Sequence, residues 1–285
     1  MPKLGRMAAS VTVAGLALSL AAFQSHADES AELIIDGTTI ATKAAAPEGS
    51  PLEENISGWR FRSAETQALE TDDFDNPGFV AVDYGAELWE DAAGSSGKSC
   101  ASCHGDASES MKGLRASMPK WNDEKGTLMT LEDHINWSRE EHQGADPWKW
   151  ESPEMLAMTA FLGVQSRGMP VNVKIDGPAE EWFNKGKELY YTRVGQLDLA
   201  CANCHEDNWG NMIRADHLSQ GQINGFPTYR LKWQGLGSTH RRFKGCMDNV
   251  RAKPFKRGSD EFTALELYIA WRGSGLSVET PAVRN

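Results

Sequence analysis

Basic charge, cysteine and long apolar runs are all scarce in this sequence. Its 285 residues hold 29 Lys and Arg against 40 Asp and Glu, a formal net charge of −11 that argues against nucleic acid as a partner. After residue 27 no apolar stretch is long enough to cross a bilayer, so no membrane span is expected there. Exported proteins usually pair an even number of cysteines in disulfides, and this chain has five.

The one long apolar run has the form of a secretory signal. Lys3 and Arg6 precede it, it extends from Met7 to Phe23, and cleavage is predicted after Ala27. Because no twin-arginine pair precedes the run, a Sec-type route is favoured. Removing this segment takes the net charge from −11 to −13 and leaves enough chain for one or two domains. The sequence therefore predicts a periplasmic protein.

Four of the five cysteines stand in two copies of one pattern. The pattern is Cys-x-x-Cys-His, the attachment site of a c-type haem. Its two thiols add to the haem vinyl groups, and the His that follows reaches the iron. We therefore predict two covalently bound haem c groups, with one His of each motif as an iron ligand. The residues are Cys100, Cys103 and His104 in the first motif, and Cys201, Cys204 and His205 in the second.

Zinc and thiol redox chemistry are the alternatives for such cysteines. Two Cys-x-x-Cys pairs could form a Cys₄ zinc site, but compact zinc ribbons hold their pairs much closer in sequence and need no His after each pair. A thioredoxin-like redox pair would need a βαβ context, which the sequence does not show. Haem attachment remains the prediction.

The sequence around the haem motifs repeats itself. Gly85 and Gly186 each stand fifteen residues before the first cysteine of a motif, on a helical pattern of apolar residues. Later in each half, residues 145–169 match residues 252–276 at an offset of 107. Each half thus has a helix, a haem motif, a variable loop and a closing helix. We predict a mostly α protein with two tandem cytochrome c-type haem domains related by internal duplication.

The repeat sets the predicted domain bounds. Residues 76–172 form the first haem domain and residues 173–285 the second, after the signal peptide at 1–27. Residues 28–75 are an N-terminal extension without a counterpart in the repeat. Its polar stretch at 38–51 is read as a poorly ordered arm or as a surface that wraps a partner.

The fifth cysteine, Cys246, has no thiol partner and lies in a basic segment. From Arg241 to Arg257 the chain carries seven basic residues and one acid, Asp248, although the whole protein is acidic. Neighbouring cations favour the thiolate over the thiol, and a thiolate can also bind haem iron. A buried inert cysteine and a basic run that only faces solvent are the alternatives. We expect Cys246 to be reactive.

These residues together resemble the SoxA family, the dihaem cytochrome subunits of the SoxAX complexes of bacterial thiosulfate oxidation. The resemblance rests on both haem motifs, on the string from Arg241 to Cys246, and on the tail from Val250 to Tyr268. It covers essentially the whole chain after the signal. The haem motifs alone would fit any c-type cytochrome, whereas a Cys246 string forty-two residues after the second motif is far more specific.

The resemblance implies an L-cysteine S-thiosulfotransferase, which oxidatively joins thiosulfate to a cysteine of the SoxYZ carrier protein. Two electrons would pass through haem to a SoxX-like monohaem cytochrome, the partner in a heterodimer, and on to a small cytochrome c. In this family the residue matching Cys246 is the sixth ligand of the second haem and is found as a persulfide. The residue matching Arg242 contacts the substrate. The second haem domain would then be the catalytic one.

The residues support the same chemistry independently. Thiosulfate is a small dianion, and a guanidinium such as that of Arg242 offers paired donors to its sulfonate oxygens. Arg241, Lys244 and Arg251 either raise the local substrate concentration or only face solvent. A plain dihaem electron carrier and a dihaem peroxidase are the alternative functions. Neither accounts for an unpaired cysteine in a basic segment.

The first haem site departs from the resemblance. Dihaem SoxA proteins carry an Ile-Asn-x-Cys-Arg stretch there, and this chain has Ser138 in place of that cysteine. Thr130 and Asp133 predict a capping box, and the helix that follows turns position 138 inward. Because a serine hydroxyl is a poor iron ligand, the first haem is expected to be five-coordinate, to bind water or to use another group. The candidate groups are His134, His142, Met111 and Met118.

Overall fold

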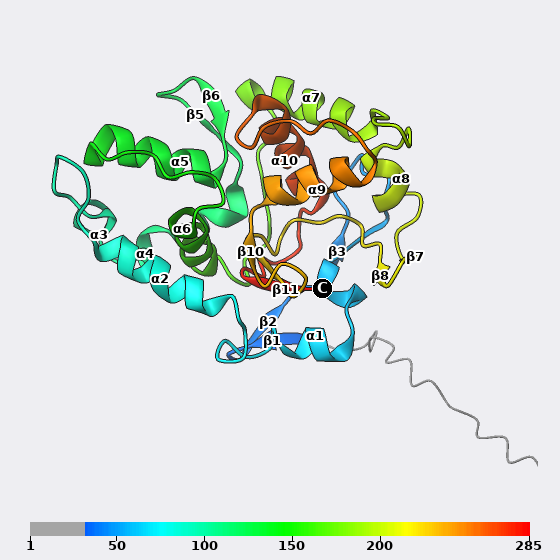
Figure 1. Ribbon diagram of the computed structural model, residues 1–285, viewed down its shortest axis with the longest axis horizontal. Coiled ribbons are helices and arrows are strands. Elements are labelled where there is room, and N and C mark those ends of the chain that lie inside the picture. Colours follow the sequence, from blue (N-terminus) through cyan, green and yellow to red (C-terminus); the bar gives the residue numbers. More distant parts are fainter. Residues whose placement is uncertain (1–31) are drawn as a thin grey trace, which may run out of the picture.

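Helices carry most of the regular backbone of the computed structural model, which describes residues 32–285 (Figure 1). The signal peptide predicted at residues 1–27 lies outside the described residues. The α-helices are α1 Ala64–Ala68, α2 Phe79–Glu90, α3 Cys100–His104, α4 Ala107–Ser110, α5 Leu131–Ser138, α6 Pro153–Val164, α7 Glu180–Tyr191, α8 Cys201–His205, α9 Thr239–Asn249 and α10 Asp260–Arg272. Short 3₁₀ turns are η1 Gly58–Phe61, η2 Arg115–Ser117 and η4 Gly177–Ala179, and η3 Arg139–Gln143 is a π-turn. Among residues 32–285 no helix is long and apolar enough to cross a membrane.

Short strands accompany these helices, so the described chain is a mixture of helix and strand rather than purely α-helical. The strands are β1 Leu33–Ile35, β2 Thr38–Ile40, β3 Lys43–Ala45, β4 Glu54–Ile56, β5 Lys120–Asn122, β6 Thr127–Met129, β7 Met212–Ile213, β8 Asp216–His217, β9 Thr228–Arg230, β10 Gly235–Gly237 and β11 Ala282–Arg284. β9 lies between antiparallel β10 and parallel β11, and the other strands form two-stranded antiparallel pairs.

Several helix starts follow from capping residues that the sequence predicts. The hydroxyl of Ser152 accepts a hydrogen bond from the N–H of Met155 at 3.3 Å, and α6 begins at the next residue. Ser259 caps α10 in the same way. Thr130 and Asp133 form the expected capping box at the start of α5. These caps satisfy backbone donors that would otherwise lack partners, and they set where each helix begins.

Two helix crossings repeat in the two halves. α2 packs against α6 in the first half, and α7 packs against α10 in the second. Each crossing is closest at a glycine: a Cβ on Gly85 would overlap the carbonyl oxygen of Ala157, and a Cβ on Gly186 would overlap that of Ala264. The two glycines align in the sequence repeat, and each allows two helix backbones to approach closely.

A hairpin of each half packs against the other half. Leu128 on β6 packs in the apolar cluster of the second half with Tyr190 and Phe262. Leu236 on β10 packs with Val82 on α2 and with α6 of the first half. Figure 1 shows the β5–β6 hairpin beside α7 and α10, and β10 near α6. This exchange joins the two halves through buried apolar surface.

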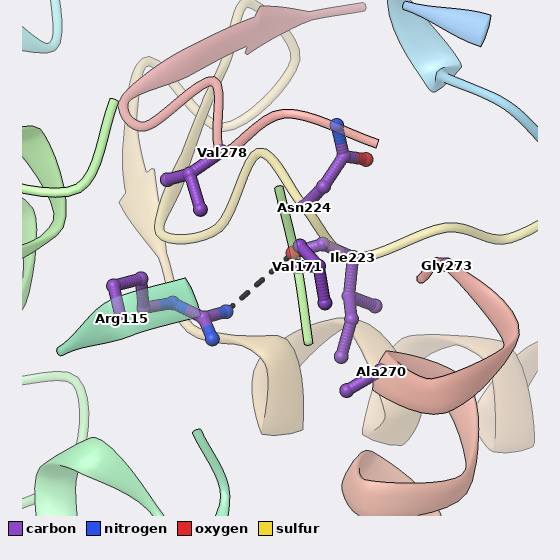
Figure 2. Close-up of a pocket in the computed structure, with 7 residues that line it drawn as sticks. All are labelled: Arg115, Val171, Ile223, Asn224, Ala270, Gly273 and Val278. Carbon is purple, nitrogen blue, oxygen red and sulfur yellow. Dashed lines mark hydrogen bonds between the residues drawn. The ribbon is translucent and has the colours of Figure 1, made fainter. Parts of the chain in front are cut away.

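A polar contact from the first half also crosses this junction. Arg115 on η2 is buried, and its Nε donates to the carbonyl of Phe226 at 3.2 Å. Its Nη2 lies 3.5 Å from the carbonyl of Ile223, which it faces across a small cavity lined by Val171 and Ala270 (Figure 2). The arginine thus caps the loop that precedes β9 and fixes it against the first half.

From residue 32 onward the N-terminal extension is folded against the second half. β1 and β2 form a hairpin whose turn holds Asp36 and Gly37 at positive φ, the preferred residues for such a turn. Leu33, Ile40 and Trp59 make its own small apolar cluster. Residues 38–51 include strands β2 and β3, so the structure gives this stretch strands in place of the poorly ordered arm that its composition suggested.

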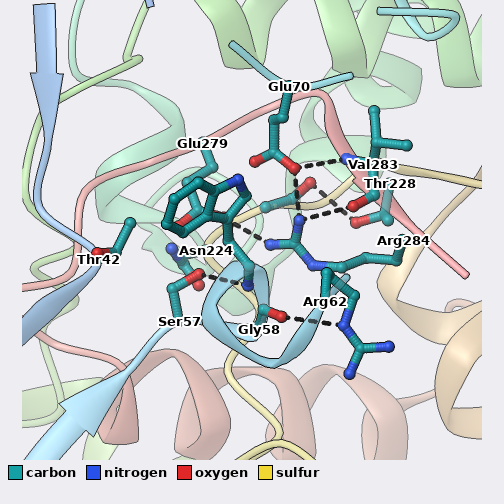
Figure 3. Close-up of polar contacts among 12 residues, drawn as sticks. Thr42, Ser57, Gly58, Arg62, Glu70, Asn224, Thr228, Glu279, Val283 and Arg284 are labelled. Carbon is teal, nitrogen blue, oxygen red and sulfur yellow. Dashed lines mark hydrogen bonds and ion pairs between the residues drawn. The ribbon is translucent and has the colours of Figure 1, made fainter. Parts of the chain in front are cut away.

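The C-terminal strand closes over the extension through a buried charge cluster (Figure 3). Arg284 Nη1 donates to Glu70 Oε2 at 2.5 Å, and Arg284 Nη2 donates to Glu279 Oε2 at 2.6 Å. The backbone N–H of Val283 also donates to Glu70. One guanidinium thus faces two buried carboxylates. Burial raises the pKa of Glu70 to about 8, although the positive charge of Arg284 acts in the opposite direction.

Candidate functional site

The second haem motif forms α8, and a backbone carbonyl fixes the ring of its histidine. His205 Nδ1 lies 2.8 Å from the carbonyl oxygen of Ser219, which can only accept, so Nδ1 carries the proton. Gly221 packs against the same ring, where a Cβ would come within 2.8 Å of the His205 Cγ. This fixes the ring orientation and leaves Nε2 without a backbone partner, the arrangement that proteins use to orient a metal-binding imidazole.

Cys246 faces this histidine from α9. The hydroxyl of Ser238 caps α9, and Cys246 stands eight residues after that cap and is half-buried. Burial alone would raise the pKa of the Cys246 thiol, but the charge of Arg242, a hydrogen bond from His205 and the charge of Arg230 outweigh it and lower that pKa to about 6. The motif thiol of Cys201 behaves oppositely, because burial and the charge of Cys246 raise its pKa to about 12.

The basic residues around Cys246 differ in their contacts. Arg242 lies one helical turn before Cys246, and within residues 32–285 its guanidinium has no carboxylate partner. Arg241 instead turns to Glu151 at 3.6 Å, and Lys244 pairs with Asp248 at 2.8 Å on the surface. Of these predicted basic residues, Arg242 is therefore the one that the structure brings to Cys246.

The first haem motif forms α3 and is more open. His104 and Cys103 are exposed, whereas their counterparts in the second motif are half-buried. The His104 ring lies 5.8 Å from the ring of Trp89, whose Nε1 donates to the carbonyl of Gly105 at 3.1 Å. No backbone carbonyl holds the His104 ring in the described part of the chain. Burial raises the pKa of Cys100, which lies 3.8 Å from Gln143 Nε2.

Ser138 stands in the first half where Cys246 stands in the second. Thr130 caps α5 and Ser138 follows eight residues later, the same spacing as from Ser238 to Cys246. The helix caps and the haem-facing helices thus align at an offset of 108. At the offset of the sequence repeat these two positions differ by one residue. The equal spacing from the two helix caps aligns them.

The other candidates for the first iron differ in their surroundings. His134 Nε2 is buried and has no hydrogen-bond partner, and burial, then the charge of Lys120, lowers the pKa of this imidazole to about 4. The His142 ring packs on Trp137 at 5.2 Å. Met118 is fully buried in the apolar core of the first half and Met111 packs against that core. The structure does not select among these groups.

The residues of both sites fit a haem c group and do not fit zinc. In the first half the Cys-x-x-Cys-His helix packs against an apolar cluster formed by side chains of α2, α5 and α6. The buried, unpartnered Nε2 of His134 and the outward Nε2 of His205 are donors suited to iron. In residues 32–285 no three His, Cys, Asp or Glu side chains gather to hold a metal ion, so the Cys₄ zinc alternative finds no support.

Sequence reasoning missed the residues that surround this site from outside the repeat. Ser219 and Gly221 orient His205, and Gln220 between them is held by two hydrogen bonds to β4 of the extension. Arg62, also from the extension, and Arg230 on β9 add positive charge near Arg242. No motif marks these residues, because they come together only through the packing of segments distant in sequence.

Comparison with known proteins gives consistent results. The family model described as SoxA/TsdA, cytochrome c domain, matches residues 84–171. The L-cysteine S-thiosulfotransferase subunit SoxA of Pseudaminobacter salicylatoxidans is 52% identical over 95% of this chain and 95% of its own length. The subunit of the same name from Paracoccus pantotrophus is 52% identical over 97% of this chain and 96% of its own. A crystal structure of SoxXA from P. pantotrophus matches with a TM-score of 0.87 and 53% identity, covering 90% of this chain and 99% of that chain.

Proposed function

Because the chain belongs to the SoxA family, we propose that it is the cytochrome subunit of an L-cysteine S-thiosulfotransferase with Cys246 as its reactive group. The family assignment rests on relatives 52% identical over almost the whole chain. The single structural observation that carries the proposal is that α9 places Cys246 one turn after Arg242 and against His205 of the second motif, where the charge of Arg242 favours the thiolate. The dihaem electron carrier and the dihaem peroxidase are not favoured, because the relatives are named for sulfur transfer.

The proposed reaction joins thiosulfate to a cysteine of a SoxYZ-type carrier. The thiol R–SH and thiosulfate S₂O₃²⁻ give R–S–S–SO₃⁻, one proton and two electrons. One sulfur–sulfur bond forms, and both sulfur atoms that form it are oxidised. Haem c, when bound, accepts the two electrons one at a time and passes them towards a SoxX-like cytochrome and a small cytochrome c.

The residues of this chain divide the remaining work. Arg242 binds the sulfonate oxygens with paired donors and leaves the sulfane sulfur pointing at Cys246. The Cys246 thiolate and the sulfane sulfur form a sulfur–sulfur bond with loss of the two electrons counted above, which gives Cys246–S–S–SO₃⁻. The carrier thiolate then attacks the sulfane sulfur, its bond to Cys246 breaks, the S–SO₃⁻ group passes to the carrier, and Cys246 leaves as a thiolate. His205, whose ring is fixed by Ser219, would be an iron ligand of the second haem.

The c-type cytochrome fold of the family implies covalently bound haem c, and we assign two haem groups to this chain. One would be bound by Cys100, Cys103 and His104, the other by Cys201, Cys204 and His205, with Cys246 as the second haem's sixth ligand. The matched helix crossings and the hairpin exchange support an internal duplication with haem domains at 76–172 and 173–285. A SoxX-type heterodimer partner and a periplasmic location complete the proposal.

The experiment that tests this function is an intact-mass measurement. The mature protein is made in a host that attaches c-type haem, beside the Cys246→Ala variant. Two haem masses plus one sulfur, with the sulfur lost in the variant, and thiosulfate-dependent modification of the carrier thiol are the expected results. An unmodified Cys246 together with no thiosulfate turnover would return the chain to the role of an electron carrier.

A further inference from the structure

Glu151, in the first half, holds a backbone conformation that favours glycine. Its φ is +66°, and it immediately precedes Ser152, the cap of α6. At the repeat offset of 107 its counterpart is Gly258, which precedes the cap of α10 and has a φ of +72°. Glycine adopts this region freely, whereas a residue with a Cβ is strained there. The turn by itself gives no reason for a glutamate, so the contacts of its side chain have to outweigh the strain.

The side chain of Glu151 reaches into the second half and binds the cap of α9. Its Oε1 accepts from the backbone N–H of Ser238 at 3.2 Å and from the hydroxyl of the same serine. The hydroxyl oxygen of Ser238 accepts from the N–H of Arg241 at 3.1 Å, and its carbonyl accepts from the N–H of Arg242 at 3.2 Å. Glu151 is therefore linked to the backbone of Arg242 through one residue, and Cys246 follows one turn later on the same helix.

Two arginines of the basic segment flank the same carboxylate. Nη1 of Arg241 lies 3.6 Å from Oε2 of Glu151 and donates to the carbonyl of Leu236 at 3.2 Å. Nε of Arg257 lies 3.9 Å from Oε1 of Glu151. Both arginine side chains are 35% exposed, against 13% for the glutamate, so each ion pair stabilises the fold only weakly. Together they fix the carboxylate between the start of α9 and the turn before α10.

The residue before Glu151 adds a second contact to α9. The ring of Trp150 stacks on that of His240, with centroids 4.4 Å apart and planes 3° apart. His240 is fully buried, and its Nδ1 accepts from the N–H of Gly258 at 3.0 Å. Both halves thus hold the first turn of α9. The aligned helix α5 is instead capped by side chains of its own first turn.

We propose that Glu151 is a positioning residue for the reaction at Cys246, contributed by the first half. By holding Ser238 it fixes the start of α9, and thereby the place from which Arg242 reaches the sulfonate. Rates fall steeply when reacting groups are displaced by about 1 Å, so a small shift of this helix is enough to slow the transfer. Glu151 acts through Ser238 and not by contact with the substrate. This inference rests on the proposed function, because that function assigns the substrate to α9.

The test measures steady-state transfer of thiosulfate to the carrier by variants of the holoprotein. Glu151→Gly removes the side chain and the strain together. We expect kcat to fall about tenfold and KM for thiosulfate to change by less than about threefold, since Arg242 keeps its charge but shifts its position. The midpoint of chemical denaturation should stay near the wild-type value, because relief of the strain offsets the lost hydrogen bonds. Glu151→Gln keeps an acceptor oxygen for Ser238 and should restore kcat to within about threefold of wild type.

A matched control and a double-mutant cycle separate positioning from general damage. Asp36→Gly is the control, because Asp36 is also an acidic residue at positive φ, +47°, in the β1–β2 turn, and it should leave kcat unchanged. Ser238→Ala should also lower kcat, and adding it to Glu151→Gly should cost less than about twofold more, because the two side chains act as one unit.

Four results would overturn the proposal. An unchanged kcat in Glu151→Gly would remove its basis, and additive losses in the cycle would separate Glu151 from Ser238. A Glu151→Gln variant as slow as Glu151→Gly would assign the effect to charge. A denaturation midpoint that falls together with kcat would show that Glu151 only supports the fold.

Amide hydrogen exchange tests the positioning without turnover. The N–H of Arg242, which donates to Ser238, should exchange about tenfold faster in Glu151→Gly, while exchange in α5 stays as in the wild type. Identical exchange at Arg242 in variant and wild type would contradict the proposal. A wild type that never modifies the carrier would refute the proposed function alone, and exchange would still decide whether Glu151 holds α9. If Glu151→Gly does not keep its haem content, Ser238→Ala carries the same expectations for kcat and exchange.

Discussion

The two haem-motif halves share a backbone plan and differ in what faces the haem position. In each, a capped helix carries the aligned residue at its eighth position, Ser138 in the first half and Cys246 in the second. One turn earlier the first half has the neutral His134 and the second has the cation Arg242. At this position the same scaffold thus holds a neutral side chain in one half and a positive one in the other.

The proximal sides differ as well. The second histidine is held by the carbonyl of Ser219 and packed by Gly221, whereas His104 is exposed and touches Trp89. The extra constraint comes from β4 and Arg62 of the extension, which has no counterpart beside the first motif. Two halves with the same backbone plan thus differ around their motifs, because a segment outside the repeat packs beside the second motif alone.

The largest expected effect is the loss of the reactive sulfur from one half. Cys246→Ala should lower the rate of thiosulfate transfer to the carrier by at least about a thousandfold, since it removes the covalent step. Ser138→Ala at the matched position should change the rate by less than about twofold. Steady-state turnover of both variants checks this, and equal losses would mean that the halves share the catalytic role.

The charge difference between the halves predicts the next effect. Arg242→Gln should lower kcat/KM for thiosulfate about a hundredfold, because a desolvated charge-assisted contact to the sulfonate is lost. Lys244→Gln, which breaks a surface pair with Asp248, serves as the control and should stay near wild type. A comparable loss of kcat/KM in both variants would indicate that thiosulfate is attracted by the summed positive charge of the segment and not by a specific contact with Arg242.

The shared scaffold predicts equal damage in both halves from one kind of change. Gly85→Ala and Gly186→Ala each place a methyl group on a carbonyl oxygen of the crossing helix. Each should reduce the free energy of unfolding by about 2–3 kcal/mol, as overpacking does. Chemical denaturation of the two variants is the measurement. If only one glycine is sensitive, the crossings are not equivalent.

Restoring the missing sulfur should make the first site resemble the second. Ser138→Cys places a thiol at the position aligned with Cys246, where an anionic ligand would stabilise Fe(III). We expect the potential of the first haem to fall by about 0.1 V or more and its low-spin electron paramagnetic resonance signal to become thiolate-like. An unchanged spectrum would show that another group, such as His134 or His142, already binds this iron.

The smallest effect concerns the closure of the chain ends beside the second half. Because the folded state raises the pKa of Glu70 to about 8, its proton is held more tightly when folded, so its stabilising contribution is present at low pH and is lost as pH rises through that value. Glu70→Gln should therefore reduce the fall in unfolding free energy between about pH 7 and about pH 8 by about 1 kcal/mol. Denaturation at both pH values compares variant and wild type, and an identical fall would contradict the assignment.

Local patterns determined much of this protein. The two five-residue Cys-x-x-Cys-His strings are read directly from the sequence, and the helix starts at Thr130, Ser152 and Ser259 follow from side chains that bond their own backbone. The unpaired Cys246 and its basic neighbours are contiguous in sequence, so the proposal of a reactive second half can be made from them. Such information is local, and the chain carries it wherever it folds.

Only the tertiary structure decided what surrounds Cys246. Arg62 is separated from Asp216 by more than 150 residues of sequence, and Ser219 holds His205 through a backbone carbonyl that any residue type would supply. The folding of the extension under the second half, in place of an unordered arm, depends on apolar contacts such as those of Trp59. Long-range packing and backbone hydrogen bonds leave no periodic or compositional trace, so the sequence could name the reactive atom but not the charges that tune it.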